Sequence, residues 1–169
     1  MFNKFFLYLS IFIFIFTSNV SGEDKFFFLE LDKIVNNSDL GKKTIEKINK
    51  LNAENIKILK IRENELKELE NEIKKKRNVV SDAEYSKEIE LFKGKIKDFN
   101  NEKNTLVKKF NNFKKKELDL FFKKINPIIQ NYMDENSIEI IIDSKYVFMG
   151  KTSSDITLKI IEQINQNTN

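Results

Sequence analysis

The charged side chains that could do acid–base chemistry in this chain of 169 residues are those of lysine, arginine, aspartate and glutamate, and the sequence holds no cysteine and no histidine. Paired carboxylates can act as general acid and base, but the acidic residues are spread among lysines at helical spacing and no convergent pair is visible. The missing residue types exclude thiol catalysis, disulfides and the commonest metal ligand. We therefore expect no catalytic residue, no metal site and no cofactor.

Two runs of apolar residues with a seven-residue repeat dominate the region 39–135. The first run comprises Ile45, Ile48, Leu59, Leu66, Leu69, Ile73 and Val80. The second run comprises Tyr85, Ile89, Phe92, Ile96, Phe99, Leu106, Phe110, Phe113 and Leu120. Asn52, Asn55 and Arg62 interrupt the first run. Such repeats are typical of a coiled-coil seam, so the region predicts two long helices that pack against each other.

Residues 81–84 separate the two runs and have the form of a capping box. In such a box the Ser81 hydroxyl and the Glu84 carboxylate satisfy free backbone N–H groups at the start of a new helix. The chain is therefore expected to turn here and to fold back as an antiparallel hairpin, with Leu66 level with Ile96 and Phe99. At ~1.5 Å per residue the hairpin forms an arm roughly 60 Å long.

Residues 1–22 have the pattern of a cleavable secretory signal peptide. Lys4 supplies the positive start, residues 5–16 are apolar, and Ser21 and Gly22 precede the expected cleavage before Glu23. A membrane anchor is the competing interpretation, but a spanning helix needs ~20 apolar residues and this run is shorter. The sequence predicts export.

A small body is expected from the remaining residues, 23–38 and 136–169. Residues 25–31 predict a strand buried on both faces, residues 32–37 a helical turn, and Ser38 the N-cap of the first long helix. Residues 138–142 and 146–149 predict two strands joined by a tight turn into a hairpin, and residues 156–164 an amphipathic helix. Pro127 is expected to bend the second long helix where the arm meets the body.

This body is too small to be stable alone without disulfides or metal. Its aromatic first strand would also be an aggregation hazard unless another chain covered it. Both problems disappear if several copies share one core, so we expect an oligomer held together by the body. The residues expected in this shared core are Phe26, Phe27, Phe28, Leu29, Leu31, Ile140, Ile141, Ile142, Val147 and Phe148.

Basic residues are concentrated in the arm, which has a positive balance, whereas the body has a negative one. The densest cluster, near the arm's tip, is Lys74, Lys75, Lys76 and Arg77. It could attract an anionic membrane surface or nucleic acid. Solvated lysines are common on helices, and this simpler interpretation stays open.

The two ends of the chain after the signal peptide resemble the Skp/OmpH family of periplasmic chaperones. The resemblance lies in residues 31–38 followed by Gly41, in residues 140–143 followed by Tyr146, and in residues 155–157. Residues 81–85 are similar to the family's hairpin tip. The heptads between these segments are less specific, and the aromatic first strand departs from the family's commoner aliphatic pattern.

The resemblance implies an α+β protein, mostly α, in which three bodies form a β-barrel and three helical arms project around a cavity. It implies a homotrimer that holds unfolded outer-membrane proteins in the periplasm without ATP. The family's lipopolysaccharide-binding residues cannot be matched to positions here.

Apolar residues that lie off the two seams are the candidates for contact with such clients. They are Leu51, Ile58, Ile61, Val107, Leu118, Phe121 and Phe122. All lie in the half of the arm nearer the body, so we expect an apolar root and a charged tip. Scattered surface apolar residues are common in proteins without a binding role, which is the competing interpretation.

Two other function classes compete with a chaperone. A signal peptide argues against a nucleic-acid binder, so no nucleic acid is expected as partner. A structural or adhesive coiled coil of the cell envelope is the main alternative, although one would then expect a single uninterrupted heptad run rather than a hairpin on a small body.

Overall fold

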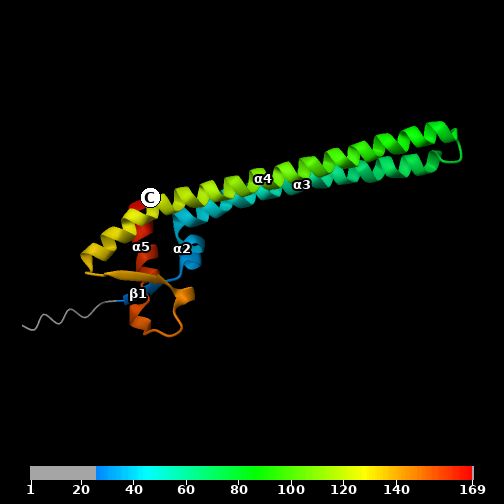
Figure 1. The fold of residues 1–169 in the computed structure, drawn as a ribbon. Coiled ribbons are helices and arrows are strands. Elements are labelled where there is room, and N and C mark those ends of the chain that lie inside the picture. The colour runs from blue at the N-terminus through cyan, green and yellow to red at the C-terminus, as the bar shows by residue number, and fades with distance from the viewer. Residues whose placement is uncertain (1–25, 169) are drawn as a thin grey trace, which may run out of the picture.

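A computed structural model describes residues 26–168, so the predicted signal peptide lies outside the described residues. Two long helices form an arm that projects from a small body (Figure 1). The elements in chain order are β1 (Phe26–Leu29), α2 (Leu31–Asn37), α3 (Asp39–Lys76), α4 (Asp82–Glu135), β2 (Ile140–Asp143), the 3-10 helices η1 (Ser144–Tyr146) and η2 (Thr152–Ser154), and α5 (Thr157–Thr168).

Both predicted N-cap serines of the arm are confirmed, whereas the Glu84 carboxylate of the predicted capping box accepts no backbone hydrogen bond among the described residues. The Ser38 hydroxyl accepts a hydrogen bond from the Gly41 N–H at 3.1 Å, and the Ser81 hydroxyl accepts one from the Glu84 N–H at 3.3 Å. Each serine satisfies one of the backbone donors that a helix leaves free at its start. The turn between α3 and α4 therefore falls where the sequence predicted it.

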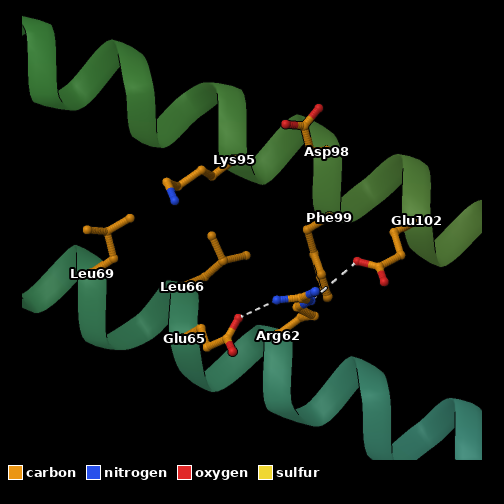
Figure 2. A pocket seen from close by; sticks show the side chains of 8 residues that line it. All are labelled: Arg62, Glu65, Leu66, Leu69, Lys95, Asp98, Phe99 and Glu102. Atoms are coloured by element: carbon orange, nitrogen blue, oxygen red, sulfur yellow. Dashed lines mark hydrogen bonds and ion pairs between the residues drawn. The ribbon is translucent and has the colours of Figure 1, made fainter.

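Three ion pairs between α3 and α4 report the register of the arm. They join Lys47 to Glu117 at 3.4 Å, Arg62 to Glu102 at 3.7 Å, and Lys76 to Glu88 at 2.8 Å; Figure 2 shows the middle pair. From one pair to the next, α3 advances and α4 retreats by the same number of residues. One antiparallel register therefore holds from the body to the tip, within one residue of the register predicted from the seams.

The seam residues of the arm are mostly half-buried, as expected for a two-helix structure. Ile48 and Ile73 are the most covered, each 4% exposed. Two assignments are wrong, because Ile96 and Leu120 are exposed. Phe121 is buried in place of Leu120, since α4 there also contributes to the body core and a straight helix drifts ~20° per heptad from a strict seven-residue repeat.

The body sheet pairs β1 with β2 in parallel, from Phe26 opposite Ile140 to Leu29 opposite Asp143. The predicted hairpin of residues 138–142 with residues 146–149 is therefore wrong. After β2 the chain enters η1, where the Asp143 carboxylate accepts a hydrogen bond from the Lys145 N–H at 3.2 Å and turns the chain out of the sheet. Parallel strands need a long connection, and the whole arm supplies it here.

The body core joins the start of the chain, its end and the last part of α4. The fully packed residues are Leu29, Ile34, Phe121, Ile125, Ile138, Ile156, Ile160 and Ile164. The predicted amphipathic helix is confirmed as α5, whose buried face includes Ile160 and Ile164. Pro127 lies within α4, and the last part of that helix bends away from the line of the arm (Figure 1).

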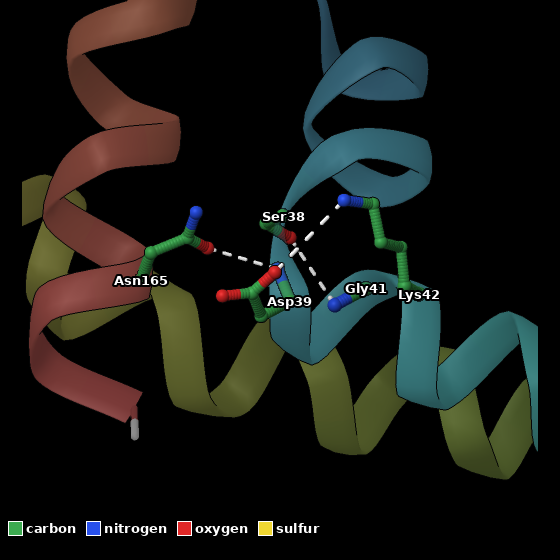
Figure 3. A network of polar contacts seen from close by, with 5 residues as sticks. All are labelled: Ser38, Asp39, Gly41, Lys42 and Asn165. Carbon is green, nitrogen blue, oxygen red and sulfur yellow. Dashed lines mark hydrogen bonds and ion pairs between the residues drawn. The ribbon is translucent and has the colours of Figure 1, made fainter.

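The corner between α2 and α3 is fixed by polar contacts and by a glycine (Figure 3). The Asp39 N–H donates a hydrogen bond to Asn165 Oδ1 of α5 at 2.8 Å. A Cβ atom at Gly41 would lie 2.1 Å from the Val35 carbonyl oxygen, so only glycine fits without a backbone shift. The arm is therefore set on the body by a tight corner and a hydrogen bond to the last helix.

Candidate binding surfaces

Several charged residues of the arm form ion pairs. Within residues 26–168, no cluster of histidine, cysteine, aspartate and glutamate could hold a metal ion. The hydrogen bond to Glu65, followed by the charges of Glu65 and Glu102, raises the pKa of Arg62. The hydrogen bond to Glu88 likewise raises the pKa of Lys76. Both cations stay protonated, and their role is to link or brace the helices.

A groove opens between the helices midway along the arm, and we call it the mid-arm groove (Figure 2). Its volume is about 270 Å³, and its lining residues are Arg62, Glu65, Leu66, Leu69, Lys95, Asp98, Phe99 and Glu102. Pockets for whole drug-sized ligands start at about 300 Å³. The groove is therefore suited to a single large side chain rather than to a cofactor.

The predicted off-seam residues divide into three groups. Ile58, Ile61 and Val107 are exposed on the arm, whereas Leu51 and Leu118 are half-buried. The assignment of Phe121 to a binding surface is wrong, since it is 1% exposed in the body core. Phe122 is partly buried and packs against that core, with its ring centroid 5.3 Å from that of Phe121.

Sequence reasoning missed several exposed apolar residues of the arm. Ile56 lies beside the predicted group on α3, and Leu91 lies on the tip-side half of α4. Val79, in the turn at the tip, is 81% exposed. The tip-side half of the arm therefore also exposes apolar side chains, which the expected gradient from an apolar root to a charged tip did not include. Heptad positions outside the seam were the available signal, because Ile56 and Leu91 stand at such positions.

The basic residues at the tip are largely engaged. Lys74 pairs with Glu70 at 2.6 Å, Lys76 pairs with Glu88, and the Arg77 guanidinium lies 5.8 Å from the centre of the Tyr85 ring. Lys75 has no carboxylate within 4.0 Å among the described residues. The sequence suggested a free cationic cluster, but neighbouring acids pair with two of its four cations.

A further group of exposed apolar residues belongs to the body. Ile140 and Ile142 are exposed along β2 and Phe26 on β1, while Phe148 is 100% exposed. Tyr146 and Met149 are exposed beside it. The other residues assigned to a shared core are half-buried, namely Phe27, Phe28, Leu31, Ile141 and Val147, or buried, namely Leu29. The residues left uncovered by this single chain thus surround one small sheet.

No helix within residues 26–168 combines the length and the apolar character of a membrane span. Residues 25–164 match a family model described as outer membrane protein (OmpH-like). No curated protein sequence matches the chain significantly.

Among solved structures, the chain is similar to a candidate outer membrane chaperone (OmpH-like) from Caulobacter crescentus CB15. The TM-score is 0.73 at 13% sequence identity, and the match covers 84% of this chain and 84% of that one. At this identity the similarity concerns the fold alone. It confirms the predicted fold class, a long helical hairpin on a small body with a strand pair.

Proposed function

Because the chain belongs to the OmpH-like family of outer membrane proteins, we propose that it is a chaperone of the periplasm that holds unfolded outer-membrane proteins without ATP and prevents their aggregation. Its clients bind the arms through dispersed aliphatic side chains. It has no catalytic role and needs no cofactor. The predicted signal peptide at residues 1–22 exports it.

The observation that carries this proposal is the row of exposed aliphatic residues on a charged helical hairpin. Ile56, Ile58, Ile61 and Val107 stand in one stretch of the arm without partners across the seam. The arm's aromatic residues, in contrast, are half-buried in the seam. Contacts by separate aliphatic groups are weak and need no precise shape complementarity. Such contacts suit the reversible binding of many different unfolded chains.

The assembly that we propose is a homotrimer built on the body. Support comes from the exposed sheet residues together with Phe148, whose surface a stable monomer would bury. Residues 146–149 have the strand-like pattern Tyr-Val-Phe-Met but form no strand in the single chain. A strand that pairs only with another copy would explain this difference. We leave the membrane surface outside the proposal, since the tip's cations are mostly engaged.

The assembly is tested by deleting residues 45–118 and joining the ends with a short turn. The product is expected to remain a small oligomer, measured by native mass spectrometry or light scattering. A folded monomeric product would contradict oligomerisation through the body.

The client surface is tested by replacing Ile56, Ile58, Ile61 and Val107 together with glutamine. The matched control replaces the same four residues with leucine, which keeps the surface apolar and the helices stable. We expect both variants to keep their helix content and oligomeric state. Only the glutamine variant should lose suppression of aggregation of an unfolded β-barrel protein.

Equal protection by the glutamine variant and the parent would contradict the proposed surface. If neither the parent nor the leucine variant protected clients, the chaperone function itself would be refuted. The structural coiled coil of the envelope would then become the better explanation.

A further inference from the structure

The mid-arm groove has an uncovered apolar floor, formed by Leu66, Leu69 and Phe99 (Figure 2). It exists because Arg62 occupies a seam position where an apolar residue would close the gap. Arg62 donates a hydrogen bond to Glu65 at 2.9 Å and forms an ion pair with Glu102 at 3.7 Å. These carboxylates hold the guanidinium at the body-side end of the groove.

The two ends of the groove differ in charge. At the body side, Arg62 is shared by Glu65 and Glu102, so the three side chains together carry one net negative charge. All three already have a partner of opposite charge. At the tip side, Lys95 has no carboxylate within 4.0 Å among the described residues. In Figure 2 its side chain runs into the space between the helices near Leu66 and Leu69, whereas Asp98 points away from that space. Lys95 is therefore the charge that the groove offers to an occupant.

We infer that the mid-arm groove receives client segments in which a large apolar side chain stands next to a carboxylate. The apolar side chain lies on Leu66, Leu69 and Phe99, and the carboxylate pairs with Lys95. This inference rests on the proposed function and gives it a preferred client sequence. The groove's volume of about 270 Å³ limits the occupant to one large side chain.

The opposite preference, for a basic residue next to the apolar one, is disfavoured by the same geometry. A client lysine could pair with Glu65 or Glu102 only by breaking the ion pair of that glutamate with Arg62. Its positive charge would also be repelled by Lys95. An acidic segment breaks no existing pair. The preference is therefore for acidic over basic neighbours.

The test uses the full protein and three short peptides with blocked ends, centred on Asp-Phe, Asn-Phe or Asp-Ala. Binding is measured at low salt by NMR, from the methyl signals of Leu66 and Leu69. We expect the Asp-Phe peptide to bind most tightly and to shift both signals. Lys95→Gln should weaken it roughly threefold, as for an exposed ion pair, and leave the Asn-Phe peptide unchanged.

Lys97→Gln is the matched control, since it removes an equal charge from an exposed residue of α4 that does not line the groove. A second variant, Arg62→Leu, restores an apolar seam residue. Arg62→Leu should reduce binding of the Asp-Phe and Asn-Phe peptides and raise the thermal midpoint of the arm. Because the arm would then be more stable, its unfolding could not be the cause of the weaker binding.

Equal losses from Lys95→Gln and Lys97→Gln would overturn the inference, since they would report general charge attraction. Equal binding of the Asp-Ala peptide, or unshifted Leu66 and Leu69 signals, would also overturn it. If the parent still suppressed client aggregation in any of these cases, the groove would be excluded and the proposed function would stand.

Discussion

The arm and the body bury their apolar residues to different depths. In the body Ile34, Ile125, Ile160 and Ile164 are completely buried, each covered from several sides by helices and the sheet. Of the seam residues along the arm only Ile48 and Ile73 become buried, and the others are half-buried or, at Ile96 and Leu120, exposed. In a two-helix arm, each seam side chain is covered only by the one facing helix, and its other sides stay open to solvent. The body should therefore unfold as one unit, whereas the arm can open locally.

The polar contacts of the two regions differ in the same way. In the body the Glu30 N–H donates to Thr157 Oγ1 at 3.0 Å, a partly buried bond that joins β1 to the start of α5. The polar contacts across the arm are ion pairs that join an exposed cation to a half-buried glutamate at the surface, and each of them contributes little. The contacts of the body join segments far apart in the sequence and therefore form cooperatively. The contacts along the arm can form and break independently of one another.

The largest effect is expected from Phe121→Ala in the body. Truncating a buried phenylalanine costs about 3–5 kcal/mol in the free energy of unfolding. Chemical denaturation should show this loss, with its neighbour Leu120→Ala as the control because Leu120 is exposed. Equal effects of the two substitutions would show that α4 is rotated from the orientation described.

Two glycine substitutions should have opposite signs. Gly41→Ala forces the backbone of the α2–α3 corner apart and should lower stability by about 1–3 kcal/mol. Gly94→Ala adds a methyl group in open space on α4 and should raise helix stability by about 1 kcal/mol. Thermal melts of both variants measure this. A stabilising Gly41→Ala would mean that the corner is looser than described.

Phe99→Ala should have a smaller effect than Phe121→Ala, because Phe99 is only half-buried in the seam. We expect a loss of about 1–2 kcal/mol, below that of a fully buried phenylalanine. It should speed amide hydrogen exchange in α3 and α4 while leaving the body's exchange unchanged. Faster exchange in both regions would show that the arm and the body unfold together.

The smallest effect concerns Asp143, at the end of β2. The Lys145 ammonium lies 2.7 Å from the Asp143 carboxylate, and its side-chain hydrogen bond lowers the pKa of Asp143. The pair therefore adds stability above the ordinary pKa of aspartate, and this is lost as the pH falls through the lowered value. In an NMR titration Lys145→Met should move the Asp143 midpoint upward, and Lys151→Met should not. No movement with Lys145→Met would exclude the pair.

The sequence predicts the arm well because its pattern is local. Caps at Ser38 and Ser81 and a repeat of seven are read from neighbouring residues, and the structure confirms both helices. The errors lie where distant segments compete. A seven-residue repeat cannot show that this part of α4 also packs into the body core, so it placed Leu120 rather than Phe121 in the buried position.

The strand order of the body could not be read from the sequence for a related reason. Residues 138–142 and 146–149 are close in sequence and both have a strand-like pattern, so the sequence predicts that they pair as a hairpin. The structure instead pairs β2 with β1 across the whole arm. The hydrophobic pattern marks Arg62 as an interruption of the seam, but it does not show that Glu65 and Glu102 hold the guanidinium to one side and leave the mid-arm groove open.

The parallel pairing of β1 with β2 has a consequence for the order of folding. During synthesis or export from the N-terminus, the Phe-rich β1 emerges first and waits for β2, which follows only after the entire arm. Closing a flexible loop of that length carries an entropic cost that grows with its length. Contacts between neighbouring turns let the hairpin form early, and its antiparallel helices then bring the two strands together. The folded arm therefore holds β1 and β2 near each other and lowers the entropic cost of pairing them. We expect the body to fold after the arm.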